Sequence, residues 1–194
     1  IGDSITDCGR RDESPPLGNG YVSIAANLAT ARYPDRDIEW INRGVSGDVV
    51  QGLVERWTKD VIHERPDWVS IAIGINNVAR DQASGRDPDS CLTGSYRQIL
   101  NRTKEETTAA LIMFETFYIA EEDRSQRRFK VDEYNKIIHS LAAEYKALLV
   151  PVNSAFKQAL SKGLGRVWTQ EDGVHPLPIG HALMALTLLE TLGW

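Results

Sequence analysis

Four short segments of the chain carry the residue types that acyl transfer requires. Ser4 lies in a Gly-Asp-Ser turn, where its hydroxyl could act as a nucleophile beside a base. Asp172 and His175 are three residues apart, so the carboxylate can bond one imidazole nitrogen and leave the other free as a general base. Two glycines in segment 42–48 allow close backbone approach to a ligand, and Asn76 can offer an N–H to an oxyanion. Together they supply every part of an acyl-transfer site.

Each segment taken alone also has an ordinary structural interpretation. Ser4 suits a helix N-cap, segment 42–48 suits a tight strand-to-helix turn, and Asn76 suits an Asx-turn. The functional interpretation depends on the four segments occurring together, in loops that the predicted sheet would bring to one edge.

A capped turn is the ordinary structural interpretation of Asp172 and His175, and a metal half-site is another. No cluster of His, Cys or Asp elsewhere in the sequence completes it. The remaining histidines lie singly on helical segments, where we expect them to be structural or exposed: His63, His139 and His181. The sequence therefore predicts no metal ligands.

The apolar pattern predicts the elements that would position these loops. Strands buried on both faces are expected at 38–44, 67–74, 109–117 and 148–153, with a further strand ending at Gly2. Amphipathic helices are expected at 20–33, 49–64, 92–107, 129–146 and 178–192. This alternation predicts an α/β fold with a five-stranded parallel sheet and helices on both faces. Ligands then bind outside the carboxyl ends of the strands.

The four segments resemble, in order, the sequence blocks of the SGNH (GDSL-type) hydrolase superfamily. They are Gly2-Asp3-Ser4, Gly44 to Gly47, Gly74-Ile75-Asn76 and Asp172-Gly173-Val174-His175-Pro176. The resemblance covers nearly the whole chain. It implies a flavodoxin-like three-layer α/β/α sandwich in a single domain, residues 1–194, whose first strand is shortened at its start. It also implies catalysis without a metal or an organic cofactor.

The resemblance assigns roles by position. Ser4 is the nucleophile, His175 the general base and Asp172 the carboxylate that orients it. The Ser4 amide, the Gly47 amide and the Asn76 side chain form the oxyanion hole. These roles predict ester hydrolysis through an acyl-enzyme.

Three further features bear on the substrate pocket. The family's third block usually ends Asn-Asp, whereas this chain has Asn77 there, which puts the hydrogen bonding of the loop in question. Stretches 79–92 and 121–130 are expected as hydrophilic loops at the pocket rim, which favours a polar substrate over a long lipid. Trp168 is either a sugar-stacking residue or a core residue.

Intracellular bacterial acetylxylan esterases have sequences similar to segments 2–10, 66–71 and 117–119 of this chain. This resemblance implies deacetylation of xylo-oligosaccharides and assembly into a homo-oligomer. The expected function is therefore a serine esterase acting on acetylated sugars in the cytoplasm. A lysophospholipase, a thioesterase or another short-chain esterase on the same triad is an alternative. A non-catalytic carbohydrate-binding domain is a further alternative.

Composition excludes several other classes. The chain has 194 residues, with 22 basic and 27 acidic side chains and a net charge of −5, which disfavours nucleic acid and anionic membranes as partners. No apolar run approaches the ~18 residues of a membrane span. The two cysteines, Cys8 and Cys91, are expected as reduced thiols, with one bridge between them as the alternative. The chain opens as the tail of a strand would, so a removed leader and secretion stay open.

Overall fold

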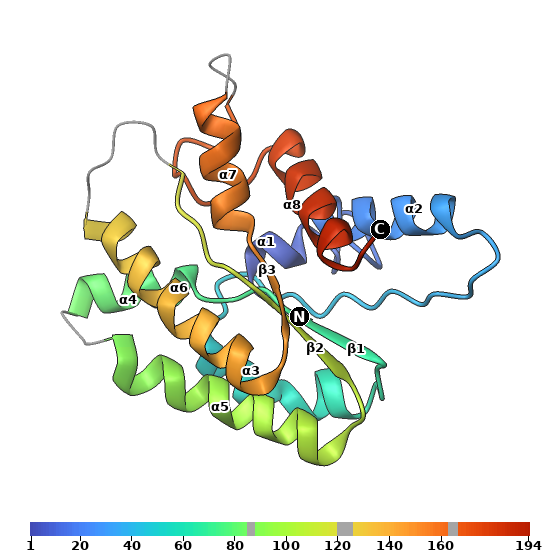
Figure 1. Ribbon diagram of the computed structural model, residues 1–194, viewed down its shortest axis with the longest axis horizontal. Coiled ribbons are helices and arrows are strands. Elements are labelled where there is room, and N and C mark those ends of the chain that lie inside the picture. Colours follow the sequence, from blue (N-terminus) through green and yellow to red (C-terminus); the bar gives the residue numbers. More distant parts are fainter. Residues whose placement is uncertain (85–87, 120–125, 163–166) are drawn as a thin grey trace.

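A parallel three-stranded sheet in the order β1–β2–β3 lies at the centre of the molecule (Figure 1). The computed structural model describes residues 1–84, 88–119, 126–162 and 167–194. The strands are β1 (Trp68–Ile71), β2 (Ala110–Phe114) and β3 (Leu148–Val150). Trp68 pairs with Ala110, and Ile112 pairs with Leu148. The short apolar strands have helices on both sides, as parallel strands require.

Two groups of helices cover the sheet (Figure 1). One group contains α3 (Val50–Trp57), α4 (Ile75–Ser84), α5 (Pro88–Glu106) and α6 (Gln126–Tyr145). The other contains α2 (Tyr21–Arg32), α7 (Val152–Ser161) and α8 (Pro178–Thr191). Two short helices, α1 (Ser4–Asp7) and the π-helix η1 (Thr58–Ile62), complete the described elements. The predicted α/β class with a parallel sheet is confirmed.

The predicted number of strands is wrong, because the described residues form three strands rather than five. Segment 38–44 is not a strand, and its Gly44 makes one isolated parallel bridge to Gly2. Gly2 makes another bridge to Ala72, so the strand predicted to end there is also reduced to single bridges. The physical reason is a missing neighbour: before Gly44, segment 38–43 borders a groove rather than a second backbone.

Several helix boundaries also differ from the prediction. The helix expected at 49–64 is α3 followed by the wider turns of η1. The expected strand 148–153 ends early, because α7 begins at Val152, directly after Pro151. The loop expected at 79–92 is mostly helical, in α4 and the start of α5. Of the second expected rim loop, residues 121–125 lie outside the described residues and 126–130 belong to α6.

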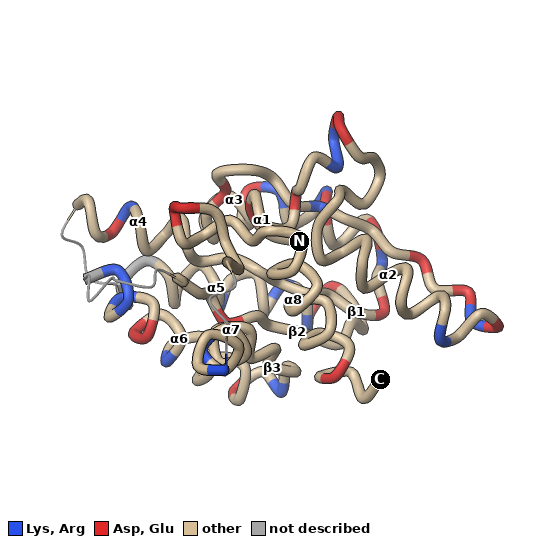
Figure 2. The backbone as a smooth tube through the Cα atoms, turned by 90° about the horizontal axis from the view of Figure 1, so that it is seen from above, with Lys and Arg blue, Asp and Glu red and all other residues tan. Residues whose placement is uncertain are grey.

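Charged residues are interspersed along the described chain when it is viewed from above (Figure 2). Among the described helices, none combines the length and the apolar character that crossing a bilayer requires.

Candidate active site

Ser4 is the first residue of the short helix α1. It lies two residues after Gly2, which bridges to Ala72 at the carboxyl end of β1. Its neighbour Asp3 is the N-cap, and the Asp3 Oδ1 accepts the Ile5 amide at 3.0 Å. Burial raises the pKa of Asp3 to about 7, although the bond from Ile5 opposes the shift. The capping role therefore belongs to Asp3, and the Ser4 hydroxyl remains available for another partner.

The structure brings Ser4, His175 and Asp172 together from opposite ends of the chain. The Ser4 Oγ lies 2.9 Å from the His175 Nε2. The His175 Nδ1 lies 2.5 Å from the Asp172 Oδ2. With the carboxylate at Nδ1, the imidazole carries its proton there and presents Nε2 to the hydroxyl as an acceptor. This chain of contacts can move a proton from Ser4 to His175.

The Asp172 carboxylate is held in its ionised form. Its partial burial alone would raise the pKa. Hydrogen bonds from the His175 side chain and from the amides of Val174 and His175 outweigh that effect and leave the pKa of Asp172 below its ordinary value. The two amides reach the Asp172 Oδ1 at 2.8 and 3.0 Å. An anionic carboxylate is the state that stabilises an imidazolium at His175.

The triad loop, residues 169–176, carries both Asp172 and His175. Its ends are joined by a bridge between Thr169 and Pro176. Gly173 has a φ of 68°, and its carbonyl accepts the Ile119 amide at 2.8 Å. The segment after β2 therefore anchors this loop at its tip.

A second loop, residues 44–50, lies beside Ser4 and is called the oxyanion loop below. Most of its amides have acceptors at 2.8–3.2 Å, namely those of Gly44, Val45, Ser46, Asp48, Val49 and Val50. The Gly47 amide has none among the described residues, and Gly47 is exposed. No atom lies within 4 Å of the place where its Cβ would be. Its N–H is thus free to meet a ligand.

Asn76, the second residue of α4, connects the segment after β1 to the oxyanion loop. Its Nδ2 donates to the Asp48 carbonyl at 2.9 Å. An Asx-turn on its own backbone, the alternative interpretation, is therefore not what this side chain forms. Because an amide group carries two N–H donors, Asn76 can bond Asp48 and still offer the second N–H.

Asn77 is well accommodated in place of the family's usual aspartate. Its Oδ1 accepts the Val50 amide at 3.1 Å, at the start of α3. Its Nδ2 donates to the Gln51 Oε1 at 2.9 Å. An aspartate could form the first bond, while the second uses the amide. Both the Oδ1 and the Nδ2 of Asn77 therefore have hydrogen-bond partners, so the loop accommodates this residue.

Trp168 contributes to packing, so its sugar-stacking interpretation is not supported. It is partly buried against the hydrophobic core, and its ring meets that of Phe156 edge to face at a centroid distance of 6.4 Å. Its carbonyl accepts the Leu177 amide at 2.9 Å. Trp168 therefore packs against the core directly before the triad loop.

His181 is a structural residue next to the site. Its Nδ1 accepts the Tyr21 amide at 3.2 Å, and its Nε2 lies 3.4 Å from the Cys8 Sγ. Burial, together with the nearby His175, lowers the pKa of His181 to about 4, so the ring is neutral. Cys8 is a free thiol, whereas the side chain of Cys91 lies outside the described residues. The described residues also contain no group of His, Cys, Asp and Glu able to hold a metal ion.

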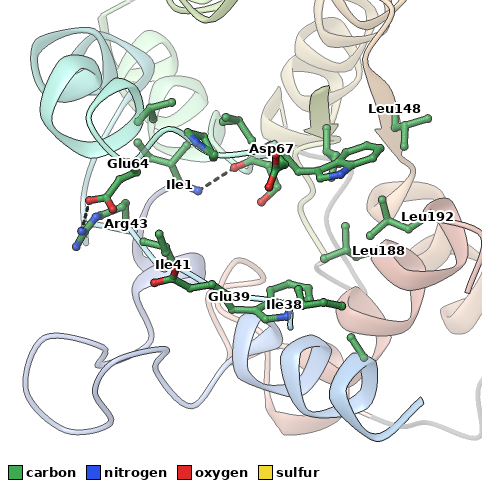
Figure 3. Close-up of a pocket in the computed structure, with 18 of the residues that line it drawn as sticks. Ile1, Ile38, Glu39, Ile41, Arg43, Glu64, Asp67, Leu148, Leu188 and Leu192 are labelled. Atoms are coloured by element: carbon green, nitrogen blue, oxygen red, sulfur yellow. Dashed lines mark hydrogen bonds and ion pairs between the residues drawn. The ribbon is translucent and has the colours of Figure 1, made fainter. Parts of the chain in front are cut away.

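A cavity of about 1150 Å³ lies at the other end of the sheet from Ser4, beside the first residues of β1 and β3 (Figure 3). Ile38 and Ile41 line it from one segment, and Leu188 and Leu192 line it from the end of α8. The amino group of Ile1 at its margin donates to the Ser70 carbonyl at 2.8 Å. Ser4, Asp172 and His175 are not among the described residues that line it, so this cavity is separate from their meeting point.

Comparisons with known proteins agree with this geometry. The sequence profile of the GDSL-like Lipase/Acylhydrolase family matches residues 1–183. An acetylxylan esterase from Geobacillus stearothermophilus is 37% identical over 204 residues, covering 100% of this chain and 92% of that protein. Its crystal structure has a TM-score of 0.88 at 34% identity, with 100% and 92% of the two chains covered. An alpha/beta hydrolase from the metagenome of Lake Arreo, Spain, has a TM-score of 0.86 at 30% identity, with 100% and 93% covered.

Structures of catalytic mutants of the Geobacillus enzyme replace a serine, an aspartate or a histidine with alanine. The aspartate and histidine of that enzyme are three positions apart, as Asp172 and His175 are in this chain. The same three residue types meet in the structure described above.

Proposed function

Because the chain belongs to the GDSL-like lipase/acylhydrolase family, we propose that it deacetylates acetylated xylo-oligosaccharides through an acyl-enzyme on Ser4. Its family and its acetylxylan esterase relative make it an SGNH-type serine esterase. The observation that carries the assignment of the nucleophile is the 2.9 Å contact between the Ser4 Oγ and the His175 Nε2.

The proposed reaction has two steps. The Ser4 Oγ attacks the acetyl carbonyl carbon while its proton passes to the His175 Nε2. The bond between the former carbonyl carbon and the sugar oxygen then breaks, this oxygen takes the proton from His175 to leave as a hydroxyl, and an acetyl ester remains on Ser4. Water, deprotonated by His175, attacks this ester. Acetate departs, and the proton returns to the Ser4 Oγ.

Three N–H donors are proposed to stabilise the oxyanion of both tetrahedral intermediates. They are the amides of Ser4 and Gly47 and the Nδ2 of Asn76. The Ser4 amide is the first of its helix, and no described residue accepts it. Such fixed donors act on charge that develops only in the transition state, so they raise the rate more than they tighten substrate binding.

The surroundings of the triad support a polar substrate. The side chains of Asp172 and His175 are both 41% exposed. The neighbouring exposed residues are mostly polar or charged, namely Ser46, Arg80, Gln170 and Glu171. A sugar hydroxyl as the leaving group suits this open, hydrophilic setting better than a long acyl chain would.

The central test is Ser4→Ala assayed on an aryl acetate and on acetylated xylo-oligosaccharide. We expect kcat to fall by at least about 10⁴-fold, since the residues of a triad act as a unit. Ser161→Ala, at the far end of α7, is the matched control and should retain full activity. A fluorophosphonate should label the wild type at Ser4 and leave the Ser4→Ala variant unlabelled. Full activity in Ser4→Ala would refute the nucleophile.

The substrate class is tested separately. Acetate release from acetylated xylo-oligosaccharide should exceed release from other acetylated sugars, and a series of aryl esters should show the highest kcat/KM at acetate. A preference for long acyl chains would favour a lysophospholipase or a thioesterase instead. The expected homo-oligomer stays a prediction, which size-exclusion chromatography with light scattering can test.

A further inference from the structure

Arg56, on α3, joins segments of the site that are far apart in the sequence. Its Nε donates to the Asp48 Oδ2 at 2.8 Å, and its Nη1 donates to the Arg43 carbonyl at 2.6 Å. The same Nη1 reaches the Asp60 Oδ2 at 2.7 Å, and the Nη2 reaches the Gly2 carbonyl at 3.2 Å. The Arg56 side chain is only 17% exposed. One planar guanidinium thus satisfies four groups.

These partners frame the oxyanion loop. Arg43 directly precedes the loop, and Asp48 directly follows Gly47 within it. The Asp48 carbonyl is also the acceptor of the Asn76 Nδ2 at 2.9 Å. Arg56 therefore holds the backbone before the free Gly47 amide and the side chain of the residue after it, whose carbonyl is the acceptor that orients Asn76.

The fourth partner, Gly2, belongs to the nucleophile turn. It lies two residues before Ser4, and its carbonyl also accepts the Val45 amide of the oxyanion loop at 3.0 Å. Arg56 consequently ties the backbone that leads to the nucleophile to the loop that would hold the oxyanion.

We propose that Arg56 is a positioning residue that holds the Gly47 amide and the Asn76 side chain in register with the Ser4 hydroxyl. This inference rests on the proposed function. Arginine suits the task because its fork of five N–H donors has a fixed geometry, whereas a lysine ammonium is a point charge on a flexible stem.

The expected signature is a loss in kcat rather than in KM. A misplaced oxyanion donor weakens the transition state but leaves contacts to the bound sugar in place. Misplacements of about 1 Å can cost about 100-fold in rate, so we expect Arg56→Lys to lower kcat on an aryl acetate by about 10- to 100-fold, with KM changed less than about threefold.

Arg102→Lys is the matched control. Arg102 lies on α5 and pairs with Glu106 four residues on, as Arg56 pairs with Asp60. Its Nη2 also donates to the Thr58 hydroxyl at 2.7 Å, and none of these bonds reaches the site. We expect this variant to retain the wild-type kcat and KM.

Asp48→Asn is a second variant in case substitutions at Arg56 prevent folding. An asparagine Oδ1 can still accept the Val49 amide, as Asp48 does at 2.9 Å, but it lacks the charge that Arg56 pairs with. We expect a smaller loss in kcat, in the same direction.

A double-mutant cycle separates positioning from general destabilisation. Because Arg56 and Asn76 act on one loop, we expect Arg56→Lys to cost at least about threefold less in an Asn76→Ala background than in the wild type. Thermal unfolding measured alongside shows that each variant is folded at the assay temperature.

The outcomes are distinguishable. A wild type without esterase activity, or one unaffected by Ser4→Ala, overturns the proposed function and this inference with it. A wild type that depends on Ser4 but keeps its kcat in Arg56→Lys overturns the positioning role alone. Additive losses in the cycle overturn it as well. If Arg56 variants do not fold, an unchanged kcat in Asp48→Asn has the same meaning.

Discussion

The two loops that flank Ser4 are stabilised in different ways. The oxyanion loop takes its bonds from distant parts of the chain, including Asn77, Asp7 and Arg56. The triad loop bonds largely within itself, with Asp172 accepting the amides of the two residues that follow Gly173. The first loop depends on the whole fold, whereas the second is a local turn anchored to Ile119.

This difference suits the roles proposed for the two loops. Donors to an oxyanion stabilise the transition state only if they are already in place, because reorganisation at the moment of reaction would cost the energy they provide. A general base needs the correct tautomer and must lie within hydrogen-bond distance of the proton that it takes. A carboxylate three residues away can orient the imidazole for this within the loop itself. The long-range bonds therefore lie where rigidity has the larger effect on rate.

Asp172→Asn gives the largest expected effect of the variants that test this comparison. The asparagine Oδ1 can accept the same two amides, so the triad loop should keep its shape. The amide group favours the wrong imidazole tautomer, and we expect kcat to fall by about 10⁴-fold. Steady-state kinetics on an aryl acetate measure the loss. A thermal midpoint lowered by more than a few degrees would contradict the self-contained loop.

Asn76→Ala tests the other loop. It removes one proposed oxyanion donor and the 2.9 Å bond to the Asp48 carbonyl together. Loss of such a donor typically costs about 10²- to 10³-fold in kcat, and we expect this range with little change in KM. A raised KM at constant kcat would show that Asn76 binds the ground state instead.

Gly173→Ala gives the smallest expected effect. Its φ of 68° strains any L-residue, and a Cβ would meet the Tyr118 ring at 3.0 Å and the Ile119 carbonyl oxygen at 3.1 Å. We expect a loss of about 1–3 kcal/mol in the free energy of unfolding. Denaturant titration measures it.

Gly94→Ala is the matched control for that substitution. Gly94 lies within α5, where a Cβ meets nothing within 4 Å. We expect it to stabilise the protein by about 0.5–1 kcal/mol, since alanine is the better helix former. Equal destabilisation by both substitutions would show that the tip of the triad loop is not specially constrained.

The sequence was informative wherever a feature is local. The helices expected at 20–33, 92–107 and 178–192 correspond to α2, α5 and α8 to within a few residues. Asp172 and His175 lie close enough in sequence for their pairing to be expected from spacing. The meeting of that pair with Ser4 required the further assumption of a parallel sheet.

Features that depend on distant partners were missed. Segment 38–44 has the composition of a strand, but a strand also needs a neighbouring backbone, and only Gly44 finds one. The polar segment 75–84 gave a weak apolar pattern, with Ile75 and Val78 as its buried aliphatic residues, so α4 was not predicted. Arg56 lies four residues before Asp60, which signals an ordinary surface pair. Its bonds to Gly2 and Arg43 have no local signature.

One consequence of Gly47 concerns chirality. Its φ is 79°, yet the space around the position of its Cβ is empty. A side chain at this position is therefore disfavoured by the handedness of natural amino acids and not by lack of space. A D-alanine introduced by semisynthesis favours a positive φ, so it could adopt the same backbone conformation and keep the N–H pointing as it does now.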